Sequence, residues 1–141
     1  MGDAGPGPFA VIGADTSVLV RYLVGTPRAQ ARRAAALLDG DEEIGVSPVA
    51  LVECAHVLRT QYDIERGRII EALIGLVQRA NVRVIGLRTD VVVDVLVRAR
   101  QLPGRPIPDA LIVASSIAGD ALPLATFDRD QHRYGIATRE P

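Results

Sequence analysis

Four acidic residues of this chain lie at the ends of apolar segments or inside one. Asp15 and Asp128 each follow a short β-favouring run, whereas Asp109 precedes the apolar segment ALIVASSIA. Glu53 interrupts the apolar segment VALVECAHVL, and glutamate is almost never fully buried unless it is paired. The chemistry available to this protein therefore depends on whether these carboxylates meet.

Carboxylates that are held close together repel, so their pKa values rise unless a cation lies between them. A hard divalent ion removes that cost, and Mg²⁺ takes oxygen ligands while keeping several waters. Such an ion recruits phosphate oxygens and supplies a metal-bound hydroxide for in-line attack. No Cys or His cluster accompanies the acids, which favours Mg²⁺ or Mn²⁺ over zinc. We interpret His56 and His132 as core or surface residues rather than metal ligands.

Each acid also has a purely structural explanation. Asp109 can serve as an N-cap or first-turn acid of a helix, and Asp128 can begin a turn. Glu53 can point to solvent from its helix. Asp15 is harder to explain in this way, because Thr16 and Ser17 after it are alternative helix caps.

Strands and helices are predicted to alternate along the chain. Apolar stripes and capping residues predict helices at residues 15–24, 28–38, 48–61, 63–81, 89–101 and 109–118. β-Favouring runs predict strands at 9–14, 44–46, 82–87 and 124–127, with an edge strand around 136–138. This alternation is typical of an α/β fold in which helices flank a parallel sheet. Because parallel strands end along one edge, the four acids are predicted to lie on one side of that sheet.

Length and composition limit the classes of protein to consider. At 141 residues and 15.0 kDa, we expect one domain over residues 9–141, after a flexible Gly/Pro leader at residues 1–8. The net charge of −1 excludes a protein that coats nucleic acid through a global positive field. All 16 basic residues are Arg, which excludes mechanisms that need a lysine. A lone Cys54, without a signal sequence or a run of transmembrane length, predicts a soluble cytoplasmic protein.

The order of these motifs resembles the PIN-domain ribonucleases, in particular the VapC-like toxins of type II toxin–antitoxin systems. The resemblance rests on a hydrophobic strand followed by D-T-S, the glutamate of S-P-V-A-L-V-E, then P-D-A-L-I-V-A, and finally L-A-T-F-D-R-D. It covers the chain from about residue 9 to residue 133. It implies a three-layer α/β/α fold, with a central, mostly parallel sheet of four to five strands flanked by helices.

The resemblance also implies roles for individual residues. The family's four acids fall on Asp15, Glu53, Asp109 and Asp128 in chain order, although Asp130 lies close to the fourth. The first and third are the metal ligands most often assigned, and the second and fourth complete the pocket or hold a second ion. Predicted substrate contacts are the small hydroxyl residues and the arginines near the acids: Thr16, Ser17, Thr126, Arg105 and Arg129.

The implied activity is Mg²⁺- or Mn²⁺-dependent cleavage of RNA, which leaves a 5′-phosphate and a 3′-hydroxyl. The implied partners are an RNA substrate, a second copy in a homodimer, and a cognate antitoxin that packs along a helical groove near residues 28–38. A phosphorylated receiver domain is excluded because it needs a lysine, and an aspartyl phosphatase because Thr16 and Ser17 replace its D-x-D pattern. A PIN-like domain that only binds RNA or a partner stays open as the alternative.

Overall fold

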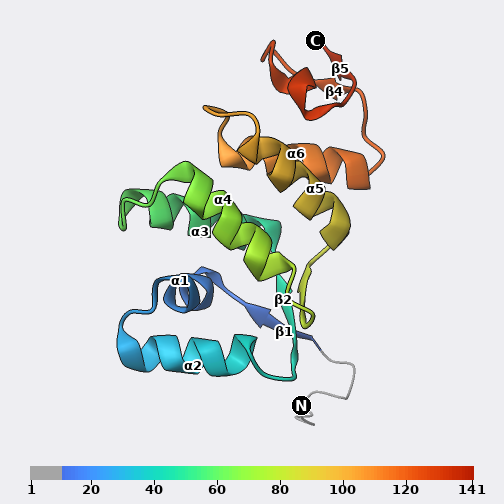
Figure 1. Ribbon diagram of the computed structural model, residues 1–141. Coiled ribbons are helices and arrows are strands. Elements are labelled where there is room, and N and C mark those ends of the chain that lie inside the picture. The colour runs from blue at the N-terminus through green and yellow to red at the C-terminus, as the bar shows by residue number, and fades with distance from the viewer. Residues whose placement is uncertain (1–10) are drawn as a thin grey trace.

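Three parallel strands form the sheet of the N-terminal half, in the order β1-β2-β3 (Figure 1). The structure is a computed structural model and describes residues 11–141. The elements in chain order are β1 Val11–Ala14, α1 Thr16–Val24, α2 Arg28–Leu38, β2 Glu43–Val46, α3 Pro48–Thr60, α4 Arg66–Val77, β3 Val82–Val84, α5 Thr89–Arg100, α6 Ile107–Ala118, β4 Leu124–Ala125, the 3₁₀ turn η1 Gln131–Tyr134, and β5 Thr138–Arg139. The α/β class predicted from the alternation of strands and helices is confirmed.

The helices begin where short polar residues or prolines allow it. Ser47 caps α3 by accepting a hydrogen bond of 3.0 Å from the amide of Ala50, and Pro48 occupies the first helical position. α6 has no side-chain cap and begins at Ile107, two residues before the predicted start at Asp109. Pro106 supplies a fixed backbone angle suited to a helix entry, which explains the earlier start.

The helices stack in pairs on one another. α1 packs against α2 and α3, α3 against α4 and α6, and α5 against α4 and α6, so the pairs follow each other from the bottom of Figure 1 to the top. Their facing stripes hold fully buried side chains such as Leu51 of α3, Leu73 of α4 and Leu96 of α5. Cys54 is also fully buried in this core, and burial raises the pKa of its thiol to about 12.

The five predicted strands are present and every pairing is parallel, but they form two sheets instead of one central sheet. β4 and β5 pair only with each other, at the opposite end of the molecule from β1 (Figure 1). The physical reason lies in the helices before them. α6 packs against α3 and α5, and this packing carries the chain that follows to the far side of the helical layers.

Other sequence predictions need adjustment. The strand expected at residues 9–14 begins at Val11 in the described part of the chain, and Ala14 is its one buried residue there. The leader at residues 1–8, and Phe9, lie outside the described residues. The segment ALIVASSIA is apolar on every side, yet Ile112 is 50% exposed. Within residues 11–141, no helix has both the length and the hydropathy needed to cross a membrane.

Candidate active site

Asp15 stands at the carboxyl end of β1 and is itself the N-cap of α1. One of its carboxylate oxygens accepts hydrogen bonds of 2.7 Å from the Ser17 hydroxyl and 3.2 Å from the amide of Val18. These bonds, led by that from Ser17, lower the pKa of Asp15 below its usual value of 3.8. Thr16 and Ser17, the expected alternative caps, do not serve as the cap. The carboxylate is therefore ionised, exposed and held in a fixed position.

Glu53 lies on the exposed side of α3, opposite the start of α1. The hydroxyl of Thr16 donates a hydrogen bond of 3.1 Å to the Glu53 carboxylate. A shallow hollow of about 440 Å³ has Asp15, Thr16 and Glu53 in its wall, with Arg21 and Gln61 at the side. The structure thus brings the first two predicted acids into one open site.

Asp109 and Asp128 meet at a second place, where Arg105 lies between them. Asp109 is in the first turn of α6, and its carboxylate lies 3.0 Å from the Arg105 guanidinium. The same guanidinium forms a close ion pair with Asp128 and donates a hydrogen bond of 2.6 Å to the side-chain oxygen of Gln131. The bond from Arg105 lowers the pKa of Asp128, and that bond also raises the pKa of Arg105. A protein cation already neutralises this acidic pair.

The turn after β4 orients Asp128. Its backbone amide donates to the Thr126 hydroxyl at 2.9 Å, and its carboxylate accepts a hydrogen bond of 2.9 Å from the amide of Asp130. These are the local side-chain bonds that stabilise turns. Asp130, the acid that could be confused with Asp128, pairs instead with Arg133 at 3.5 Å. Asp128 therefore holds both the strand-end position and the contact with Arg105.

The four predicted acids do not meet in one chain. Asp15 and Glu53 lie beside α1 and α3, whereas Asp109 and Asp128 lie with α6 and the two-stranded sheet, beyond the α3–α4 pair (Figure 1). Across residues 11–141, no group of three or more Asp, Glu, His or Cys side chains is placed to hold a metal ion. The four acids that the resemblance assigns to one metal site are therefore divided between two places, and Arg105 already binds two of them.

A larger pocket of about 620 Å³ lies between α3 and the segment 104–108. Its wall contains Glu53 and His56 from α3, and the arginines Arg59, Arg66 and Arg105. Most of the remaining lining is apolar and comes from α3, Ile69 and the segment 104–108. Arg105 is already bound to two acids and Arg66 to two carbonyls, so within residues 11–141 Arg59 is the wall arginine that forms no ion pair or side-chain hydrogen bond and can meet a phosphate group.

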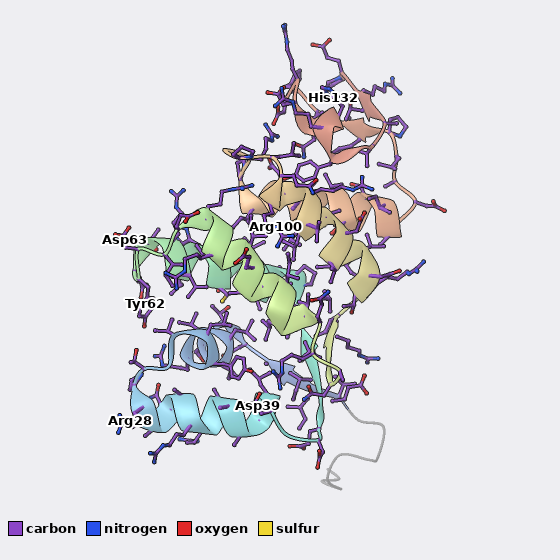
Figure 2. All side chains as sticks on the ribbon, in the orientation of Figure 1. Arg28, Asp39, Tyr62, Asp63, Arg100 and His132 are labelled. Atoms are coloured by element: carbon purple, nitrogen blue, oxygen red, sulfur yellow. The ribbon has the colours of Figure 1, made fainter. Side chains whose placement is uncertain are left out.

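Arg129, a predicted substrate contact, lies on the surface of the C-terminal part of the chain. Arg129 is exposed, and its carbonyl lies 2.9 Å from Nδ1 of His132. Figure 2 labels His132 beside the two-stranded sheet, far from Asp39 at the end of α2. Neither His56 nor His132 joins the acids in a group that could hold a metal ion in the described part of the chain.

Two residues of the η1 turn belong to the Arg105 cluster but were not predicted. Gln131 is 4% exposed and binds Arg105, and Tyr134 is fully buried beside the same cluster. Burial is the main cause that raises the pKa of Tyr134, and the charge of Asp109 raises it further. The Tyr134 hydroxyl and Nε of Arg105 have no hydrogen-bond partner within residues 11–141. The spacing of three residues between Gln131 and Tyr134, in a polar segment, is the only sequence signal for this contact.

The chain matches the model of a known protein family. The family model for the PIN domain covers residues 13–137, a range that includes all four acids. Neither curated proteins nor solved structures gave a match.

Proposed function

The chain belongs to the PIN-domain family, and from this premise we propose that it is a Mg²⁺- or Mn²⁺-dependent endoribonuclease. PIN domains are commonly nucleases that hydrolyse phosphodiester bonds, so an activity on nucleic acid follows from the family. The observation that carries the finer proposal is the set of four acids inside the matched region, in the order that the family uses.

Within this proposal, Asp15 and Asp109 are the principal metal ligands, and Asp128 and Glu53 complete the site. The ionised, exposed carboxylate of Asp15 at the end of a parallel strand supports its part in this assignment. Within residues 11–141 the two acidic pairs do not form one metal-binding group in a single chain.

The proposed substrate contacts are Thr16, Ser17, Thr126, Arg105 and Arg129. Arg59, in the wall of the larger pocket and without an ion pair within residues 11–141, supports a phosphate contact next to Glu53. Because the formal net charge of the chain is −1, binding of RNA must depend on such a local patch.

We further propose that the protein is a cytoplasmic toxin of a type II toxin–antitoxin pair, active as a homodimer and silenced by its antitoxin. A hollow of about 440 Å³ between α1 and α2, lined by Arg21, Arg33 and Leu37 among others, offers one wall for an antitoxin segment. Induced expression in a bacterium should arrest growth, and co-expression of a cognate antitoxin should restore it. Growth unaffected by either would leave a nuclease but not a toxin.

The direct experiment is cleavage of a structured RNA by the purified chain. We expect cleavage with Mg²⁺ or Mn²⁺, none after EDTA, and a loss of about a hundredfold in Asp15→Asn and in Asp109→Asn, on the scale of a lost metal contact. The control is Asp41→Asn, which removes an exposed acid of the α2–β2 turn. Cleavage that needs no metal ion, or full activity in either site variant, would contradict the proposal.

The alternative is a PIN domain that binds RNA or a protein partner without catalysis. The separation of the two acidic pairs within one chain is the observation that favours it. Binding measured by fluorescence anisotropy distinguishes the two functions. The nuclease proposal expects Asp15→Asn to keep RNA affinity while losing cleavage, whereas the alternative expects binding without cleavage in the unsubstituted chain.

A further inference from the structure

The outer edge of β1 has no strand beside it in the described chain. β1 pairs with β2 along one side only, and its four residues Val11, Ile12, Gly13 and Ala14 are apolar or glycine. Folded proteins normally protect a sheet edge with charges, prolines, bulges or a covering segment. The described residues of β1 carry no charge and no proline, and no strand of residues 11–141 pairs with this side. Gly13 is exposed, so a side chain placed there would reach solvent from the sheet face.

A second free edge belongs to β4. The amides of Leu124 and Thr126 donate hydrogen bonds of 2.9 Å to the carbonyls of Ala137 and Arg139 on the β5 side. In a parallel strand, the backbone N–H and C=O groups of alternate residues point toward opposite neighbouring strands. The N–H and C=O of Ala125, which lies between Leu124 and Thr126, therefore point away from β5. Ala125 is exposed, and Phe127, two residues further on, is 81% exposed. Parallel sheets are normally larger than two strands and buried, whereas this one has two strands in the described chain and an exposed side at Ala125.

Within one chain, these edges are kept apart. Arg66 at the start of α4 donates hydrogen bonds of 2.7 Å to the carbonyl of Arg105 and 3.0 Å to that of Ala99, which fixes the end of α5. Arg98 binds the carbonyl of Tyr134, whose side chain is fully buried. β4 and β5 are therefore anchored on the far side of α3–α6 from β1 (Figure 1). The chain could bring β4 to its own β1 only by breaking these contacts.

We propose that two copies of this chain exchange their C-terminal strands, so that β4 of each copy pairs in parallel with β1 of the other. Each half of the dimer then contains one five-stranded sheet in the order β3-β2-β1-β4-β5, with the last two strands from the partner. The contact is reciprocal, as a two-fold dimer requires, and it closes both free edges without a third copy. A second copy supplies a free parallel edge of matching apolar character for each of these strands.

The exchange also unites the divided site. Asp15 ends β1 and Asp128 follows β4, so parallel pairing of these strands brings both carboxylates to the same sheet edge. Each site then takes Asp15 and Glu53 from one copy and Asp109 and Asp128 from the other. This composite site rests on the proposed function, whereas the exchange of strands rests only on the two edges.

Cysteine cross-linking tests the exchange without any measurement of activity. We would co-express differently tagged Gly13→Cys and Ala125→Cys chains and treat the purified mixture with a short bis-maleimide. The native Cys54 thiol is fully buried and does not compete. The expected product is a covalent dimer that carries both tags, and the matched pair Gly75→Cys with Ala125→Cys, whose first site lies on the exposed face of α4, should give none.

The Gly13→Cys/Ala125→Cys double variant separates the possible arrangements. Covalent dimers support the exchange. Cross-links confined to single chains would show that β4 returns to its own β1, and this outcome overturns the proposal. A monomeric protein by light scattering, or a dimer without cross-links between these two positions, overturns it as well.

Complementation tests the composite site. Asp15→Asn and Asp128→Asn homodimers should each lose cleavage, whereas co-expressed chains should recover about a quarter of the unsubstituted activity, because half of random dimers are mixed and each has one intact site. If the cysteine variants cross-link but the unsubstituted protein does not cleave RNA, the nuclease proposal is rejected and the exchange of strands stays supported. Activity in the unsubstituted protein without complementation would reject the composite site.

Discussion

The guanidinium of Arg105 lies 3.0 Å from the carboxylate of Asp109, one helical turn further along the chain, and this contact is largely shielded from solvent. The same guanidinium binds Asp128, so one cation holds the start of α6 to the turn after β4. The cluster of Arg105, Asp109 and Asp128 is thus a structural joint, a set of ion pairs that holds two segments of the chain together, as well as a part of the candidate site.

Loss of Arg105 should destabilise this joint. Arg105→Ala leaves Asp109 and Asp128 close together without a cation, and we expect the free energy of unfolding to fall by about 1–3 kcal/mol. Urea denaturation measures this change. The matched control is Arg129→Ala, which removes an exposed arginine near the same turn and should change the free energy by less than about 0.5 kcal/mol. Equal effects of the two variants would contradict the joint.

Stability should fall in acid partly because of Asp15. Its folded-state pKa is below the usual value of 3.8, so its hydrogen bonds stabilise the folded chain at pH values above the unfolded-state pKa. This stabilisation is lost as the pH falls through the folded-state pKa. The urea midpoint of the unsubstituted chain should therefore drop more between about pH 6 and pH 3 than that of Asp15→Asn. Asp41→Asn, at an exposed acid, should follow the unsubstituted curve. Parallel curves for all three proteins would contradict a role for Asp15.

In addition to the substrate contact proposed for it, the Thr16 hydroxyl should hold the Glu53 carboxylate in position. Thr16→Val keeps the shape of the side chain but removes the hydrogen bond of 3.1 Å to Glu53, and we expect cleavage to fall by about tenfold. Thr16→Ser keeps a hydroxyl and should restore most of that loss. The concentration of Mg²⁺ needed for half-maximal activity should rise in Thr16→Val, whereas a merely structural role would lower stability and leave it unchanged.

Two glycine positions should respond in opposite directions to alanine. Gly75 is an exposed residue of α4, and a Cβ added to it would meet open space, so Gly75→Ala should raise the free energy of unfolding by about 0.5–1 kcal/mol. Gly135 has φ +80°, and a Cβ there would lie 2.5 Å from the Arg98 guanidinium. Gly135→Ala should therefore destabilise the chain by about 1 kcal/mol or more. Thermal and urea unfolding check both, and a stabilising Gly135→Ala would contradict the geometry.

Local signals in the sequence were sufficient to predict most of the helices and to place Asp15 at the end of a strand. Ser47-Pro48 predicts the start of α3, and an apolar run that stops at an acid predicts a strand end. These features depend on residues near one another in the chain. The α/β class follows from the same local patterns.

The place of β4 could not be predicted from the sequence, because it depends on how α5 and α6 pack. Both strands are apolar, and each pairs in parallel with a strand of its own sheet, so nothing local in either one predicts which strand lies beside it. The contact between Arg105 and Asp128 was missed for a related reason. It joins two loops that only the packing of α6 and η1 brings together.

Cys54 can report how often the core of the molecule opens. Its thiol is fully buried in α3, and with a pKa of about 12 almost none of it is thiolate at neutral pH. A thiol-reactive dye can therefore label the chain only when α3 separates from the helices packed on it. Labelling followed by mass spectrometry would give the rate of those openings in the unsubstituted protein, and ligands or partners that hold the helices together would lower that rate.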